Sequence, residues 1–208
     1  MSMLRNRSIK PNCLALIIMI SASLFVSFFT NATTVSANEL KNKTTSSGDS
    51  NRAKEYTVKA AFLYNFLNYT TWPERTFANK DTPLVIGIFG KDPFDSIIDK
   101  VLAEKQVDKR SIIIKRFNQI EEVQGVHALF LGEMESKLRS QLYAHLAEKP
   151  VLTVGDARDM AGKDTCLFSF YVSSGKVRFE ASIDAIKRSD LVLSSQLLKL
   201  ADIVEKRR

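Results

Sequence analysis

Histidine and serine are the residues of this chain that could supply a base and a nucleophile. The 208-residue chain holds two histidines, His127 and His145. A hydrolytic site needs a nucleophile within reach of such a base, and Ser194-Ser195 lacks the Gly-x-Ser-x-Gly elbow that would present one. A serine in front of a helical segment is more often the cap of that helix. We therefore predict that the protein is not an enzyme, with a histidine-dependent hydrolase as an alternative.

A glycine-containing segment is the next candidate for chemistry, because glycine-rich loops can hold phosphate. Gly87-Ile-Phe-Gly90-Lys91-Asp92 follows an apolar run. A P-loop needs four residues between its glycines and a Ser or Thr after the lysine, and this segment has neither. It is predicted to be a turn that ends a strand, with Asp92-Pro93 beginning the next element. Since helix N-termini can bind anions, ligand binding at this edge is left open.

Aspartates and cysteines offer little support for a metal or redox site. Asp156, Asp159 and Asp164 share a glycine-containing loop, but their spacing is not that of a calcium loop. A solvated loop without a metal is predicted. Cys13 lies in a segment predicted to be removed, so Cys166 has no partner and no disulfide is expected. Cys166 opens an apolar run, where a buried thiol behaves as a small hydrophobic side chain.

The N-terminal residues have the layout of a secretory signal peptide. Basic residues precede an uncharged run over residues 13–29, and Val35-Ser36-Ala37 fits a small-x-small cleavage site. Residues 1–37 are predicted to be the signal peptide, with cleavage after Ala32 and an uncleaved membrane anchor as alternatives. Residues 38–53 are polar and are predicted to be a flexible leader. Residues 54–205 have the length of one domain.

The charge balance gives no pattern typical of nucleic-acid binding. The chain has 30 Lys and Arg against 23 Asp and Glu, and removal of the three basic residues of the signal peptide leaves 27 and a net charge of +4. The remaining positive charges are scattered and are not interleaved with aromatic residues. We therefore predict a solvated surface and no nucleic-acid partner.

Residues 56–72 form a very apolar helix candidate that is followed by proline. One predicted face carries Val58, Ala61, Phe62, Asn65, Phe66 and Tyr69, and a second apolar line carries Tyr56, Ala60, Leu63 and Leu67. Most of this helix is therefore predicted to be buried against a sheet, and Pro73 is predicted to end it. Asn65 is predicted to be a buried amide bonded to neighbouring backbone, with a ligand contact as the alternative.

Short β-branched runs alternate with helical patterns in the middle of the chain. The predicted strands are 84–89, 111–116, 128–131 and 151–154, and the predicted helices are 96–104 and 135–148. This alternation indicates a single α/β domain with a mainly parallel sheet flanked by helices, in a Rossmann-like, three-layer arrangement.

The alternation of strand and helix patterns ends in the last quarter of the chain. Residues 166–172 and 176–183 flank Ser173-Ser174-Gly175 like the strands of a C-terminal β-hairpin. Residues 184–188 are predicted to form a short helix, and residues 194–205 a closing helix.

Several motifs occur in a characteristic order along the chain. They are Lys59-Ala-Ala-Phe-Leu-Tyr-Asn-Phe66 with Trp72-Pro73, Ile86-Gly-Ile-Phe-Gly90 with Asp92-Pro-Phe94, His127-Ala-Leu-Phe-Leu131, Pro150-Val-Leu-Thr-Val-Gly-Asp156, Val177-Arg-Phe-Glu180 and Leu193-Ser-Ser-Gln-Leu-Leu-Lys-Leu-Ala201. Together they resemble the YfiR family of periplasmic proteins. The resemblance spans nearly the whole predicted domain and is therefore specific.

This resemblance implies a periplasmic regulator that binds the periplasmic sensor part of a membrane diguanylate cyclase and represses that enzyme. Cytoplasmic cyclic di-GMP would then stay low. Such a regulator does no chemistry and needs no cofactor, and a homodimer is left open. Relatives commonly carry a cysteine just before the position of His127, where this chain has Val126. Control through a disulfide is therefore not expected.

A leucine-rich block near the C-terminus is the predicted partner surface, because it supplies more apolar surface than one short helix needs. It comprises Leu191, Leu193, Leu197, Leu198 and Leu200. The alternative is that these leucines cover the sheet. A different class of function is a small-ligand binding module that uses the C-terminal edges of the strands as its pocket.

Overall fold

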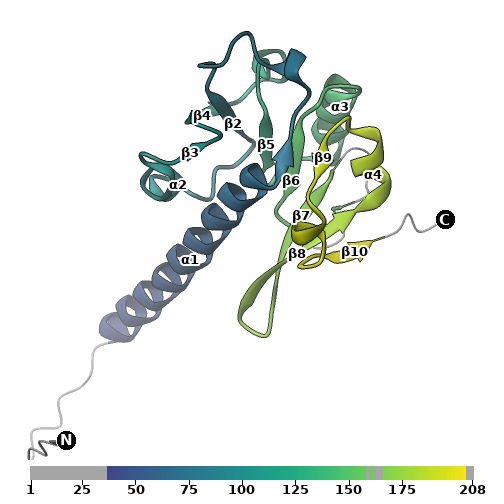
Figure 1. The fold of residues 1–208 in the computed structure, drawn as a ribbon. Coiled ribbons are helices and arrows are strands. Elements are labelled where there is room, and N and C mark those ends of the chain that lie inside the picture. Colours follow the sequence, from purple (N-terminus) through teal and green to yellow (C-terminus); the bar gives the residue numbers. More distant parts are fainter. Residues whose placement is uncertain (1–36, 158–159, 162–165, 205–208) are drawn as a thin grey trace, which may run out of the picture.

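An eight-stranded, mostly parallel sheet forms the centre of the molecule (Figure 1). The computed structural model describes residues 37–157, 160–161 and 166–204. The strand order is β10-β8-β7-β6-β5-β2-β4-β3, and the strands from β4 to β7 run parallel. The strands are β2 (Leu84–Phe89), β3 (Gln106–Val107), β4 (Arg110–Phe117), β5 (Ala128–Leu131), β6 (Leu152–Gly155), β7 (Phe168–Ser173), β8 (Lys176–Ser182) and β10 (Asp202–Val204).

A small second sheet and the helices complete the fold. Strands β1 (Thr70–Thr71) and β9 (Val192–Leu193) pair antiparallel. The helices are α1 (Ala37–Asn68), α2 (Ile97–Leu102), α3 (Ser136–Leu146), α4 (Ile183–Arg188) and α5 (Ser195–Leu198), with 3₁₀ turns at Glu74–Thr76 and Ile120–Glu122.

Side chains of the central strands alternate between two separate hydrophobic cores. In β2, Ile86 and Ile88 join a core with residues of α1 and α2, whereas Val85 and Phe89 join a core with residues of α3. Successive side chains of a strand point to opposite faces of the sheet, so these cores lie on its two faces. The predicted three-layer α/β arrangement with a mainly parallel sheet is thus confirmed.

The predicted hairpin is also present. Strands β7 and β8 pair antiparallel, from Phe168 opposite Ala181 to Ser173 opposite Lys176. Ser174 and Gly175 connect them with φ angles of 50° and 70°, the left-handed region that tight hairpin turns require.

The predicted closing helix over residues 194–205 is wrong. Helix α5 covers only Ser195–Leu198, and the chain then forms β10, which pairs parallel with β8. The leucine spacing fits a helix, but residues 202–204 instead pair with β8, with Ile203 opposite Ala181, and this pairing covers the edge that β8 would otherwise expose. Tertiary pairing therefore overrides the local pattern.

Helix α1 differs from the prediction at its start and in its buried face. It begins at Ala37, so residues 38–53, predicted to be a flexible leader, are helical in the structure. No proline interrupts this stretch, and a helix can therefore continue through its polar residues. The domain boundary at residue 54 stays a prediction, and residues 1–36 of the predicted signal peptide lie outside the described residues.

The buried face of α1 is centred on Ala60, Leu63 and Leu67, together with Phe66. Asn65 is exposed, so the prediction of a buried amide is wrong. Val58 and Tyr69, on the same side as Asn65, are 44% and 40% exposed. A helix that lies on a sheet buries one side only, and here Val58, Asn65 and Tyr69 of the predicted line face solvent whereas its Phe66 is buried.

Candidate functional site

His127 is held as a neutral, structural side chain. It is 3% exposed, and its Nδ1 accepts a hydrogen bond of 3.0 Å from the Val85 amide. Phe77 stacks on the imidazole with 4.8 Å between ring centroids. Burial, with a smaller effect of the positive charge of Arg110, lowers the pKa of His127 to about 4. A base that is buried and occupied in this way is poorly placed for proton transfer.

The other candidate catalytic groups have structural contacts as well. His145 is half-buried, and its Nε2 lies 3.1 Å from the Val123 carbonyl oxygen. The Ser194 hydroxyl accepts a hydrogen bond from the Gln196 amide at 3.2 Å, so it caps α5. Burial raises the pKa of the Cys166 thiol to about 12, which keeps it protonated.

The leucine block is divided between core and surface. Leu191 and Leu197 are 6% and 2% exposed and belong to the core, so they cannot form part of an exposed patch. Leu193 and Leu198 are half-buried at the margin of that core. Only Leu200, at 70%, is largely exposed. Leu191 and Leu197 therefore fit the alternative prediction, in which the leucines cover the sheet.

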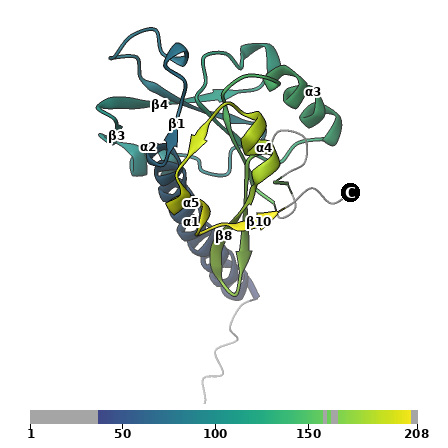
Figure 2. The ribbon, with the colours of Figure 1, turned by 45° about the vertical axis from the view of Figure 1, so that its right-hand side comes forward.

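Other apolar side chains of the same segment are exposed instead. Val192, inside the block, is 69% exposed, and Ile203, after it, is 47% exposed. Both belong to the C-terminal segment, which crosses one side of the molecule (Figure 2). Thr71 and Val192 pair across β1 and β9 with both side chains outward, whereas Thr70 and Leu193 point inward. We call Val192, Leu200 and Ile203 the C-terminal apolar surface.

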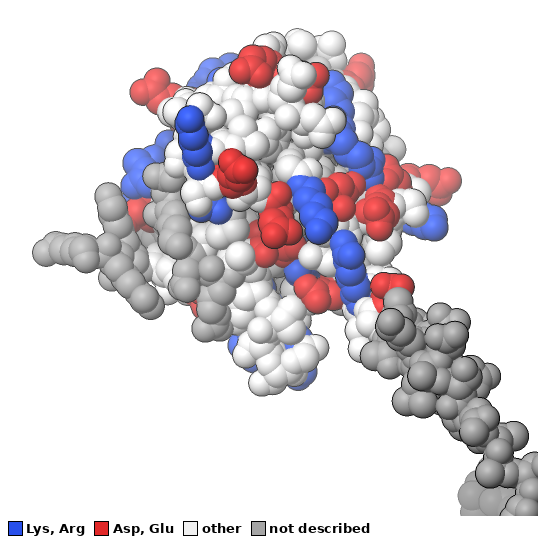
Figure 3. Space-filling view, turned by 180° about the vertical axis from the view of Figure 1, so that it is seen from behind, with Lys and Arg blue, Asp and Glu red and all other residues white. Residues whose placement is uncertain are grey.

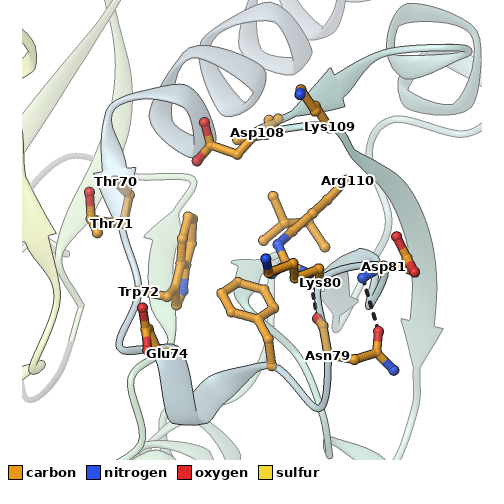
Figure 4. Close-up of a pocket in the computed structure, with 13 residues that line it drawn as sticks. Thr70, Thr71, Trp72, Glu74, Asn79, Lys80, Asp81, Asp108, Lys109 and Arg110 are labelled. Atoms are coloured by element: carbon orange, nitrogen blue, oxygen red, sulfur yellow. Dashed lines mark hydrogen bonds between the residues drawn. The ribbon is translucent and has the colours of Figure 1, made fainter.

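A cavity of about 660 Å³ lies at the amino end of β2, between the loop after Trp72 and the β3–β4 turn (Figure 4). Its three acidic and three basic side chains balance: Glu74, Asp81, Asp108, Lys80, Lys109 and Arg110. Arg110 donates hydrogen bonds to the carbonyl oxygens of Asn79 and Thr82 and lies 3.9 Å from the centroid of Phe77. The best-placed cation of this cavity is therefore already used in holding the loop.

A second cavity, of about 490 Å³, lies at the opposite end of the strands. We call it the strand-end crevice. It is bordered by α1, by the segments that follow β2, β5 and β6, and by α3. Ligands of open α/β sheets bind outside the carboxyl ends of the strands, so this cavity has the position expected of a binding site.

Asp156 and Tyr56, which line the strand-end crevice, both belong to a buried polar cluster around Lys59. The Lys59 ammonium donates to Asp156 Oδ1 at 2.6 Å and lies 2.5 Å from a Glu55 carboxylate oxygen. The Tyr56 hydroxyl donates to Asp156 Oδ2 at 2.8 Å. Burial, with the hydrogen bond to Asp156 as the second cause, raises the pKa of the Tyr56 phenol. Tyr56 is therefore a neutral donor, and both Asp156 oxygens are occupied.

Asp156 is the only one of the three loop aspartates whose role the structure describes, because Asp159 and Asp164 lie outside the described residues. Within the described residues, no cluster of His, Cys, Asp and Glu side chains could hold a metal ion. Charges of both signs are interspersed over the face of the molecule seen in Figure 3.

Comparison with models of protein families identifies the family of this chain. A family model described as YfiR/HmsC-like (DUF4154) matches residues 56–202, well over half of the sequence. The chain belongs to the YfiR/HmsC-like family. Membership implies a periplasmic protein that regulates diguanylate cyclase signalling. The role of this family is regulatory rather than catalytic. Among the described residues of this YfiR/HmsC-like chain, no helix has the length and apolar character needed to cross a bilayer.

Sequence reasoning missed the Lys59–Asp156 pair. Lys59 and Asp156 both lie in the quoted YfiR-like motifs, but nothing in their spacing indicates that they meet. The sequence did contain one indication of this pair, which is a lysine on an otherwise apolar helix. A buried lysine requires a partner.

Proposed function

We propose that this YfiR/HmsC-like protein is a periplasmic regulator that binds the periplasmic sensor part of a membrane diguanylate cyclase and holds that enzyme inactive. The match over residues 56–202 is the observation that carries this proposal. Cytoplasmic cyclic di-GMP falls as a result. The regulator achieves this by binding the inactive conformation of the cyclase more tightly than the active one, because a ligand shifts an equilibrium only through its differential affinity.

The C-terminal apolar surface is the proposed contact with the cyclase. Its members Val192, Leu200 and Ile203 are large apolar side chains between 47% and 70% exposed, and they occur within one short segment. Large apolar side chains that stay exposed are candidates for a protein interface. The predicted leucine block thus contributes Leu200 directly, whereas Leu191 and Leu197 support the segment from beneath.

The first experiment tests the regulatory role itself. Deletion of the gene is expected to raise cyclic di-GMP, and the tagged protein is expected to co-purify with a membrane diguanylate cyclase after crosslinking in the periplasm. Unchanged cyclic di-GMP together with the absence of a cyclase from the purified material refutes the proposal.

The second experiment tests the surface. The double variant Val192→Asp/Leu200→Asp places two charges in the proposed contact and is expected to weaken cyclase binding at least about tenfold. A matched control is Val172→Asp/Ile113→Asp, whose wild-type side chains are 50% and 41% exposed on β7 and β4. Equal binding by the two double variants, with equal thermal stability, excludes the C-terminal apolar surface as the contact.

A further inference from the structure

The strand-end crevice lies at a topological switch point of the sheet. From β2 the chain continues through α2 to β4 on one side, and from β5 it continues through α3 to β6 on the other side. Strands β2 and β5 are neighbours, so their connections leave the carboxyl ends in opposite directions and open a crevice between them. The cavity volume of about 490 Å³ falls in the range of small-molecule sites.

The floor of the crevice is closely packed backbone. Lys91 and Glu133 form an antiparallel bridge, and the Lys91 amide donates to the Glu133 carbonyl oxygen at 3.2 Å. A Cβ on Gly132 would lie 2.1 Å from the Lys91 carbonyl oxygen, so only glycine fits there. Gly90 has a φ of 86°, which also favours glycine. The two strand ends are thereby fixed against each other, and the crevice is preformed.

Three cationic side chains from three different segments border the crevice: Arg52 of α1, Lys91 after β2 and Arg139 of α3. Among the ion pairs of the described residues, none engages Arg52 or Arg139. Lys91 pairs with Glu133 at 3.7 Å, but both side chains are more than two-thirds exposed, so this pair is weak.

The acidic side chains of the crevice do not offset these cations. The Asp156 carboxylate is already bound by the Lys59 ammonium at 2.6 Å and by the Tyr56 hydroxyl at 2.8 Å. Glu133 is 84% exposed and directed to solvent. Two guanidinium groups without a carboxylate partner among the described residues therefore remain at the rim, and guanidinium groups match carboxylate and phosphate in geometry.

The rest of the lining is apolar or aromatic. Pro93, Leu131 and Met160 are buried, and Met134 is half-buried. Tyr56 presents a ring that packs edge-on against Phe94 with 5.3 Å between centroids. Methionine and aromatic side chains suit a compact apolar or aromatic group.

We propose that the strand-end crevice binds a small organic anion, an apolar or aromatic group that carries a carboxylate or phosphate. Arg52 and Arg139 hold the anionic group, Lys91 adds a third positive charge, and the apolar group lies against Tyr56, Met134 and Met160. This binding does not depend on the cyclase, so it is tested on the purified protein alone.

The test uses three probes of nearly the same shape: benzoate, benzamide and benzamidine, which are anionic, neutral and cationic. Two-dimensional amide NMR follows the protein during titration with each probe in a phosphate-free buffer. Benzoate is expected to give saturable shifts at the amides of Lys91, Gly132 and Glu133. Benzamide is expected to bind roughly tenfold more weakly, the effect of one charge-assisted hydrogen bond. Inorganic phosphate is expected to displace benzoate.

The double variant Arg52→Gln/Arg139→Gln is expected to bind benzoate no more tightly than benzamide. The control variant Arg178→Gln/Lys187→Gln loses the same charge from exposed positions on β8 and α4 and is expected to keep the preference. Equal affinities for the three probes, a preference for benzamidine, or shifts only outside the crevice overturns the proposal. Failure of inorganic phosphate to displace benzoate restricts the ligand class to carboxylates.

Discussion

Replacement of Lys59 by methionine tests whether the buried ion pair stabilises the domain. The Lys59 side chain is 4% exposed and its partner Asp156 is 12% exposed, with 2.6 Å between the charged atoms. Loss of one partner of a buried pair costs about 3–5 kcal/mol. Asp156 keeps the Tyr56 hydroxyl, and Glu55 is exposed enough to be solvated. We therefore expect a loss at the lower limit, about 3 kcal/mol.

Urea denaturation followed by circular dichroism measures this loss. With an m-value of about 2 kcal/mol/M, the midpoint of Lys59→Met is expected about 1.5 M below that of the wild type. Lys91→Met is the matched control, because the Lys91–Glu133 pair has side chains 70% and 84% exposed. Its stability is expected to change by no more than about 0.5 kcal/mol.

A double-mutant cycle separates the ion pair from the other contacts of Lys59. Asp156→Asn alone also leaves one buried charge with fewer partners, and it is expected to destabilise the domain. The double variant with Lys59→Met is expected to lose less than the sum of the single losses, by at least about 1 kcal/mol. Strictly additive losses, or a Lys59→Met midpoint equal to that of Lys91→Met, would show that the ion pair does not stabilise the domain.

Two further predictions concern the strand ends and pH. Gly132→Ala is expected to cost about 2–3 kcal/mol in urea denaturation, because its Cβ would lie 2.1 Å from a carbonyl oxygen. Gly125→Ala, with a φ of 63° and open space around it, is expected to cost only about 1 kcal/mol of backbone strain. The pKa of His127 is lowered to about 4 in the folded protein, so the unfolded chain binds more protons below its ordinary pKa of 6.5. The free energy of unfolding is therefore expected to fall by about 2–3 kcal/mol from pH 7 to pH 4, and His127→Gln, but not His145→Gln, is expected to reduce this fall.

The central strands could be predicted because their residues are buried on both faces. Leu84–Phe89 and Ala128–Leu131 are continuous apolar runs, and the structure places strands at these same residues. Parallel strands with helices on both faces need no polar positions, so the sequence pattern is unambiguous there. The alternation of these runs with helical segments was sufficient to give the fold class.

The last segment could not be predicted in the same way, because its structure depends on distant partners. β10 exists through its pairing with β8, and β9 through its pairing with β1. Leu197 is buried and Leu200 exposed, although both fit one helical spacing. A pattern of leucines indicates an amphipathic element but does not say which of its sides another part of the chain will cover.

Only the location of the proposed binding site could be predicted from the sequence. The carboxyl edge of the strands follows from the α/β pattern, whereas the residues that border the crevice come from separate parts of the chain. Arg52 lies in the stretch predicted to be a flexible leader, and Arg139 lies on the helix between β5 and β6. The spacing of residues along the chain does not indicate that these side chains lie close together, because their proximity is fixed by the packing of helices on the sheet.

The pairing of β1 with β9 bears on how the chain matures. Thr70, directly after the first helix, is hydrogen-bonded in register with Leu193, close to the end of the domain. A chain that emerges from a secretion channel N-terminus first cannot form this pair until its last residues have passed through. Non-local pairings of this kind form late in folding. The domain is therefore expected to depend on periplasmic chaperones during export, and a stop codon before Val192 is expected to yield a chain that is degraded.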